Sequence, residues 1–303
     1  MPPAELDTRG TELEAVVART PALPTVRAER PTTVARPRAL RAVWRVAALL
    51  FAAVMVAPLL CVLLYSFADR FSVTAALPPA YSLRWYRLFF DTPRAVTALE
   101  TSLILASAST ALALAAGLPA CRALVRRLPG RGAIEGLILL RAAVPVIVLG
   151  LGTAAVLYQF HAVDRWPSVI LAHGAGGLPF VIWAVRPAMA GLDPDLEAAA
   201  RDLGAGPVRR FWLASRAVFP AVIAGALFAF LFSMDEFAVT FLIAGQHIET
   251  LPLLLYGTLE SNSVQAAAAV AVALLVPSAV IAGSAAWLLT KVEALPGMQR
   301  RMA

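Results

Sequence analysis

The sequence has few charged residues, few histidines and few cysteines, and each shortage argues against a class of protein. Charged residues make up 15% of the 303 positions, where ordinary globular chains have about 25%. The two cysteines, Cys61 and Cys121, lie in or beside apolar segments without metal-ligand spacing, so a disulfide-stapled secreted domain is disfavoured. The three histidines, His161, His173 and His247, form no metal-binding interval such as HExxH, and the sequence lacks a GxxxxGK[ST] nucleotide-binding run.

Apolar residues are correspondingly abundant. They account for 60% of the chain, and the mean hydropathy is +0.75, against roughly 45–50% apolar residues in ordinary globular proteins. A soluble core cannot hide this much apolar surface, so the excess must face lipid. The composition predicts an all-α integral membrane protein and disfavours a soluble enzyme or a nucleic-acid binder.

Six apolar segments are long enough to cross a bilayer, since each has at least the roughly 20 residues that a spanning helix needs. Lipid offers the backbone no hydrogen-bond partners, so runs of this length are expected to be helices. The six spans cover residues 46–67, 97–119, 136–158, 168–190, 220–244 and 266–290. They define a permease-sized domain over residues 46–290. Residues 1–45, rich in arginine and proline, are predicted to be a disordered tail, and residues 291–303 a second, short tail.

The placement of basic residues predicts the orientation of the spans. The heavily basic side carries Arg27, Arg30, Arg36, Arg38, Arg41, Arg45, Arg122, Arg126, Arg127, Arg131, Arg201, Arg209, Arg210, Arg216, Lys291, Arg300 and Arg301. The opposite loops carry only Arg70, Arg84, Arg87, Arg94 and Arg165. The positive-inside rule puts the heavily basic side, with both termini, in the cytoplasm. The net charge of +7 therefore indicates topology and not a nucleic-acid partner.

The cytoplasmic loop 191–219 contains the signals of a short helix. Asp193 is a suitable N-cap, Pro194 a suitable first helical residue, and Gly204 a suitable stop. These signals predict a helix over about 194–203, with three alanines that leave a narrow surface for close approach by another protein. The helix is interpreted either as a plain connector or as a docking element for an external ATPase.

Two acidic residues, Asp235 and Glu236, fall within the fifth span, next to Ser233. An ionised carboxylate at membrane depth costs several kcal/mol unless it is paired or hydrated, so both should face the bundle interior or a water-filled path. We therefore predict that these three residues line a translocation pathway for a cationic solute. The alternative is a structural pair, or a span end that lies closer to the interface.

Other polar residues in the spans favour structural interpretations. Arg141 and Arg186 lie near span ends and are expected to extend to the interface rather than to act as counter-ions. The fourth span contains Gly174, Gly176, Gly177 and Pro179. They are expected to break or bend it, and to allow close helix contact or a gate hinge. His173, in the same span, is expected to be a hydrogen-bonded packing residue.

The segment LEAAARDLGA (residues 196–205) resembles the EAA loop of the membrane subunits of binding-protein-dependent ABC importers. The following segment, residues 220–245, with its SMDEF sequence, is similar to the second permease component of spermidine/putrescine transporters. YSLRWYRLFF (81–90) and TLPLLLYGTL (250–259) are further matches, and the resemblance covers about residues 45–290. It implies a MetI-like ABC importer permease fold of six transmembrane helices, with a cytoplasmic coupling helix between spans four and five.

The resemblance also implies which residues couple to the ATPase. Carried over by position, the coupling set is Glu197, Ala198, Ala199, Ala200, Asp202 and Gly204. The chain departs from the family pattern in two ways. Glu197 stands one residue early, so that Ala198 fills the place of the family glutamate, and the Leu-Pro before span five is missing. Outside the membrane, residues 81–90 and the loop 245–264 are predicted either to anchor in the interface or to receive a substrate-binding protein.

The leading hypothesis is a non-enzymatic permease subunit in the inner membrane that imports a small cationic solute, most simply a polyamine such as spermidine or putrescine. The implied partners are two ATP-binding subunits, a second and different permease chain, an extracytoplasmic binding protein and the lipid bilayer, but no nucleic acid. This chain is expected to bind no cofactor or metal, with ATP and Mg²⁺ used by the partner subunit. The alternatives are a self-sufficient secondary transporter, an ABC permease for iron, thiamine, phosphonate or sulfate, and, with less support, an intramembrane enzyme.

Overall fold

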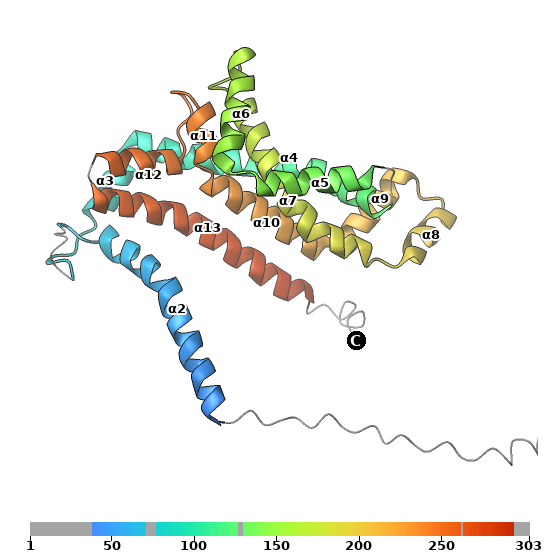
Figure 1. Cartoon of the computed structure of the whole chain (residues 1–303), viewed down its shortest axis with the longest axis horizontal. Coiled ribbons are helices and arrows are strands. Elements are labelled where there is room, and N and C mark those ends of the chain that lie inside the picture. The colour runs from blue at the N-terminus through green and yellow to red at the C-terminus, as the bar shows by residue number, and fades with distance from the viewer. Residues whose placement is uncertain (1–37, 71–76, 127–129, 262, 294–303) are drawn as a thin grey trace, which may run out of the picture. The chain divides into compact units, whose positions relative to one another are not determined.

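The computed structural model describes residues 38–70, 77–126, 130–261 and 263–293, and in these ranges the chain is built from helices (Figure 1). In chain order they are α2 (Arg38–Ser66), α3 (Arg84–Asp91), α4 (Pro93–Val125), α5 (Arg131–Ala143), α6 (Val146–Gln159), α7 (Trp166–Ala190), α8 (Pro194–Asp202), α9 (Pro207–Ala217), α10 (Phe219–Asp235), α11 (Ala238–Ile243), α12 (Leu251–Glu260) and α13 (Val264–Glu293). The all-α class predicted from composition is confirmed.

The chain divides into two compact units, residues 1–55 and 56–303, and the division falls inside α2. The segment Val43–Ser66 has a mean hydropathy of 2.8, and large apolar side chains such as Leu49 and Phe51 are exposed. In a membrane protein such a surface faces lipid or a partner subunit. Most of the predicted N-terminal tail, residues 1–37, and residues 294–303 of the predicted C-terminal tail lie outside the described residues.

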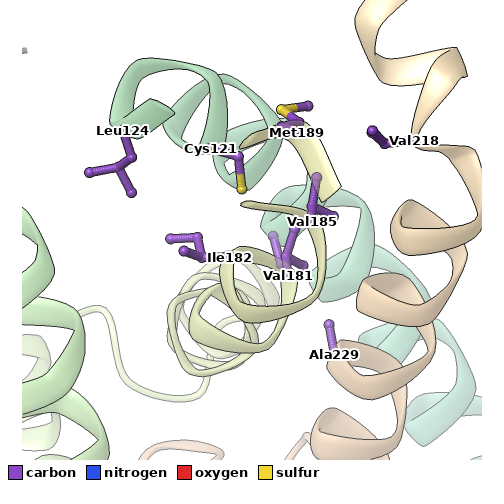
Figure 2. Close-up of a cluster of buried hydrophobic side chains, with 9 residues drawn as sticks. Cys121, Leu124, Val181, Ile182, Val185, Met189, Val218 and Ala229 are labelled. Atoms are coloured by element: carbon purple, nitrogen blue, oxygen red, sulfur yellow. The ribbon is translucent and has the colours of Figure 1, made fainter. Parts of the chain in front are cut away.

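The second unit is organised around α4, α7 and α10, which pack side by side. Their shared apolar cluster joins two residues of α4, Cys121 and Leu124, to a row on α7 and to Ala229 of α10, as Figure 2 shows. The members on α7 are Val181, Ile182, Val185 and Met189. Since these side chains are small or medium in size, the helix backbones approach closely, as is typical of membrane bundles.

Span four is not broken, because α7 runs without interruption from Trp166 to Ala190, whereas the predicted close helix contact at its glycines is confirmed. Its glycines are packing positions. A methyl group on Gly177 would lie 3.1 Å from Ala229 Cβ, and one on Gly174 would lie 2.7 Å from a methyl group of Leu112. The glycines therefore let α4 and α10 lie against α7, and the helix stays regular because its neighbours fill both of its sides.

Interruptions instead occur in spans three and five. Span three is divided between α5 and α6, whose axes differ by 105°. Val144 is extended (ψ 131°) ahead of Pro145, whose ring disfavours helical geometry at the preceding residue. Span five consists of α10, which ends at Asp235, followed by the short helix α11.

By length and composition, four helices of the described ranges can cross a membrane: α2, α4, α7 and α13. Two bent pairs, α5 with α6 and α9 with α10, raise the number to six if each pair forms one span. The spans of the bundle thus differ in kind. Some are single continuous helices, and others are interrupted, with a buried polar residue at the break in span five.

Candidate translocation path and coupling site

A buried polar network occupies the break between α10 and α11. Glu236 has an extended backbone (φ −72°, ψ 107°) between the two helices, and its side chain is buried. Its Oε1 accepts a 2.7 Å hydrogen bond from the Val239 N–H, at the start of α11. Because a helix N-terminus has free N–H groups and a partial positive charge, the carboxylate is stabilised there.

His173 of α7 is the centre of this network, since both of its ring nitrogens are used. Nδ1 lies 2.8 Å from the hydroxyl of Ser233, and Nε2 lies 2.8 Å from the hydroxyl of Thr240. Thr240 donates its single proton to the carbonyl oxygen of Glu236, at 2.9 Å, so its hydroxyl must accept from Nε2–H. In the neutral ring Nδ1 then accepts from Ser233. His173 therefore joins α10 to α11 across the break.

The predicted pathway residues do not share one environment. Ser233 and Glu236 are buried and belong to the network, whereas Asp235 is exposed at the last position of α10. Hydrogen bonding of His173 was predicted, but its position between the two halves of span five was not. The available signal was a histidine at membrane depth, where an ionisable residue is usually functional.

Arg141 lies near this site. Its Nη2 atom would be 3.1 Å from a methyl group placed on Gly176, near the middle of α7, and its charge acts on the carboxylate of Glu236. The side chain of Arg141 is thus directed toward α7, and its extension to the interface stays a prediction. Arg186 does not extend freely to the interface, since its Nη2 forms an ion pair with Glu135 at 2.9 Å.

A second site lies beyond the end of α7, where α8 forms as predicted. Asp193 caps the helix by accepting a 2.9 Å hydrogen bond from the Asp195 N–H. Beyond the C-terminus of α8, Gly204 has φ +76°, a conformation that favours glycine. The next helix, α9, exposes three large apolar residues, Val208, Trp212 and Leu213, and Leu203 is 86% exposed. Such a group of exposed apolar residues is typical of a contact surface.

The predicted coupling residues divide between two faces of α8. Ala198, Ala199, Asp202 and Gly204 are exposed, while Ala200 is buried. Glu197 turns inward, where its Oε1 pairs with Arg122 at 2.9 Å, Arg210 at 3.4 Å and also Arg126. One residue along a helix is a rotation of about 100°. The displacement of Glu197 by one position thus puts the carboxylate against α4 and α9 rather than on the exposed face.

Two ion pairs lie at the end of the bundle where α4 and α7 begin. One joins two loops, and the other joins a loop to the first turn of α4. Asp164, before α7, accepts a 3.1 Å hydrogen bond from the His247 N–H and pairs with the His247 ring. Arg94 at the start of α4 binds both carboxylate oxygens of Glu249, at 2.6 and 2.7 Å. The hydrogen bond from His247 lowers the pKa of Asp164, and the same bond raises the pKa of His247.

Among the residues that the structure describes, no group of three or more histidine, cysteine and acidic side chains is placed to hold a metal ion. The polar groups that are brought together instead lie at the two ends of the bundle and at one break inside it. The bundle combines a spanning helix that is interrupted next to a buried acid with an exposed short helix outside the bundle. This combination is typical of a membrane transport subunit.

The family confirms this class. Residues 109–294 match the family described as "Binding-protein-dependent transport system inner membrane component", and the chain belongs to it. It is therefore a multi-pass permease subunit of the inner membrane, as its apolar helices and the EAA-like segment predicted. The MetI-like fold class is confirmed with it.

Several relatives carry transport names. The putrescine transport system permease protein PotI of Escherichia coli K12 is 28% identical over 72% of this chain and 80% of its own. The spermidine/putrescine permease protein PotC of the same strain is 28% identical over 74% and 85%. The predicted resemblance to this branch is thus confirmed. The molybdate/tungstate permease protein WtpB of Thermococcus kodakarensis is 29% identical over 50% of this chain and 62% of its own.

A solved structure supports the fold. A chain of a bacterial ABC transporter involved in the import of the acidic polysaccharide alginate superimposes with a TM-score of 0.66. The match covers 86% of this chain and 99% of the other, at 18% sequence identity. At that identity the likeness extends to the arrangement of helices, and the solute must be inferred from the site.

Proposed function

We propose that this chain is one of two different permease subunits of an ABC importer for a small polyamine cation. An extracytoplasmic binding protein would deliver the solute, and two ATP-binding subunits would use ATP and Mg²⁺ to drive alternating access. The permease itself would bind no cofactor. The polyamine permeases PotI and PotC, each matched over more than two thirds of both chains, support this assignment.

The proposal places α8 and both termini in the cytoplasm. Arginine placement supports this orientation, because Arg122, Arg126, Arg201 and Arg210 all cluster where α4 ends and α8 and α9 lie. The opposite end of α7, with Asp164 and the loop before α12, would face the binding protein.

Coupling would begin at the exposed face of α8. Ala198 and Ala199 allow close approach by an ATPase groove, with Asp202 and Gly204 completing the contact. On the inner face, Ala200 packs inward and Glu197 connects α8 to Arg122 of α4 and Arg210 of α9. A displacement of α8 would therefore be passed to both helices through ion pairs, and through the packed core of α4, α7 and α10 to the break in span five.

The single observation that carries the cationic class is the buried carboxylate of Glu236 in that break. A fold shared with an alginate importer does not select a cation, so the selection must come from residues along the path. We assign Ser233, Asp235 and Glu236 to this path, with Glu236 facing the bundle and Asp235 exposed for a contact outside this chain. An acid at membrane depth suits an ammonium group.

The test is putrescine and spermidine uptake in proteoliposomes that contain the complete transporter. With Glu236→Gln, uptake should fall about ten-fold or more, since the ammonium group of the solute loses a charged hydrogen-bond acceptor. ATP hydrolysis by the complex should be retained. The matched control is Glu100→Gln, which changes an exposed carboxylate of α4 and should leave uptake unchanged.

Three outcomes would contradict the proposal. Uptake of molybdate in preference to putrescine would assign the transporter to the oxyanion class of the WtpB relative. Uptake driven by an ion gradient, without any ATP-binding subunit, would show a self-sufficient secondary transporter. Normal polyamine uptake by the Glu236→Gln variant would remove this carboxylate from the path.

A further inference from the structure

A cavity of about 650 Å³ lies between α8 and the ends of α4, α7 and α9. Its walls include four arginines from three different helices. They are Arg122 and Arg126 of α4, Arg201 of α8 and Arg210 of α9. The volume falls within the range of about 300–1,000 Å³ typical of sites for small ligands.

Positive charge in this cavity exceeds the negative charge that faces it. Two carboxylates, Asp193 and Glu197, line the same walls. Asp193 already caps α8, and one oxygen of Glu197 is shared by three of the arginines. Two of the four guanidinium charges are therefore left without a compensating carboxylate among the lining residues.

Two guanidinium donors in the cavity wall also have no acceptor. The Nη1 atom of Arg122 and the Nε atom of Arg210 are buried without a hydrogen-bond partner among the described residues. Arg122 is held in place from one side by the ring of Phe211, 5.8 Å from its guanidinium carbon. A buried donor without an acceptor costs about 1–3 kcal/mol, so rotation of either side chain toward an anion in the cavity would be favourable.

We propose that this cavity binds an anion that carries a phosphate group. Guanidinium groups match the oxygens of phosphate in geometry and charge, and several converging arginines are typical of phosphate recognition. Two of the helices that can span a membrane, α4 and α7, end at the cavity wall, at Val125 and Ala190. The phosphate can therefore come from a lipid headgroup or from solution.

The bound anion would act on the attachment of α8. It uses donors that Glu197 leaves free, and it adds negative charge where three helices carry arginine. Binding would therefore hold α8 against α4 and α9 and stabilise the chain against unfolding. This inference concerns the inner side of α8 and does not depend on which solute is transported.

The test measures thermal unfolding of the purified full-length chain in a nonionic maltoside detergent, which carries no phosphate group. One arm titrates inorganic phosphate against chloride at constant ionic strength. The other arm adds phosphatidylglycerol to the same detergent. We expect a rise in Tm in at least one arm; a response to phosphate identifies a free anion, and a response only to phosphatidylglycerol identifies a lipid headgroup.

Two variants and one control connect the effect to the cavity. Arg210→Gln should weaken binding by about ten-fold or more, because a charged donor is lost. Arg122→Lys keeps the charge but removes the planar fork, and it should also weaken binding, which covers the case in which Arg210→Gln does not fold. Arg209→Gln makes the same charge change at an exposed position of α9 outside the cavity, and should bind as the unmodified chain does.

Two results would overturn the inference. The first is the same Tm in phosphate, in chloride and with added phosphatidylglycerol. The second is an equal loss of stabilisation in Arg209→Gln and in the two cavity variants, which would show general charge screening rather than a site.

Discussion

Two polar regions of this molecule, the α8 end and the break in span five, are built on different physical principles. At α8, Glu197 is paired with three arginines, and its side chain remains 35% exposed. At the break, His173 and its partners are neutral and buried, with hydrogen bonds of 2.8 and 2.9 Å. Partly exposed ion pairs contribute little to stability and can exchange partners, whereas a fully satisfied buried network fixes one arrangement.

This difference suits the two tasks that we propose. A helix that receives motion from another protein needs contacts that tolerate a change of angle, and several arginines around one carboxylate provide them. The break near the solute path needs a defined shape, and the His173 network defines it from α7, α10 and α11 together. The predictions below test this division of roles, from the largest expected effect to the smallest.

The largest effect is expected at Gly204, which follows α8, the helix that we propose contacts the ATPase. A valine there would have to adopt φ +76°, and its side chain would project from the exposed face of α8. We expect Gly204→Val to reduce uptake to background while the protein still inserts and assembles. The measurement is uptake in proteoliposomes, with insertion checked by protease protection.

Gly206→Val is the matched control. Gly206 has φ −65° and ψ 169°, values that valine adopts readily, and a methyl group there would meet no atom within 4 Å. Uptake by this variant should stay near that of the unmodified chain. Equal losses in the two variants would show that the loop tolerates no bulk at all, and normal uptake by Gly204→Val would remove the coupling role.

The α8 region also illustrates what the sequence can predict. Asp193, Pro194 and Gly204 are local signals, and they predict a helix of almost the observed length. The arginine partners of Glu197 lie on α4 and α9, and Arg122 is 75 residues away along the chain. No local pattern reports such a contact, so the inward orientation of Glu197 had to come from the structure.

The spans show the same limit. Length and hydropathy predict where the helices of the bundle occur, but not which of them are interrupted. The glycines of α7 were expected to break or bend that helix or to allow close contact, and only the close contact of Gly177 with Ala229 is observed in a helix that is not broken. In span three, Pro145 was the better signal, because a proline restricts the residue before it whatever its neighbours are.

A smaller effect is expected from loss of the His173 network. His173→Ala leaves the buried hydroxyl of Ser233 without a partner and creates a cavity, so the free energy of unfolding should fall by about 1–3 kcal/mol. The measurement is thermal unfolding of the purified protein, together with uptake. A change in uptake without a change in Tm would contradict the structural role that we assign to the network.

The double variant His173→Leu with Ser233→Ala separates polarity from packing. It removes both members of one hydrogen bond and restores apolar volume, so it should be more stable than His173→Ala. Thr240 can still donate to the carbonyl oxygen of Glu236 in this variant. A double variant that is less stable than the single one would show that His173 contributes chiefly through contacts other than its hydrogen bonds.

The smallest effect is expected from the outer loops, where Asp164 and His247 form an ion pair but His247 is highly exposed. The pair raises the pKa of His247, so its stabilisation is fully present below the ordinary histidine pKa of about 6.5 and is lost as the pH rises through the raised value. It lowers the pKa of Asp164, so that stabilisation is lost only in acid, as the pH falls through the lowered value. Between these limits the loops should be held together.

Hydrogen exchange of residues 244–250, measured from pH 5 to 9, tests this pair. Protection should decline toward the alkaline end, and His247→Gln should abolish that decline. An unchanged pH profile in His247→Gln would show that the decline does not come from the Asp164–His247 pair.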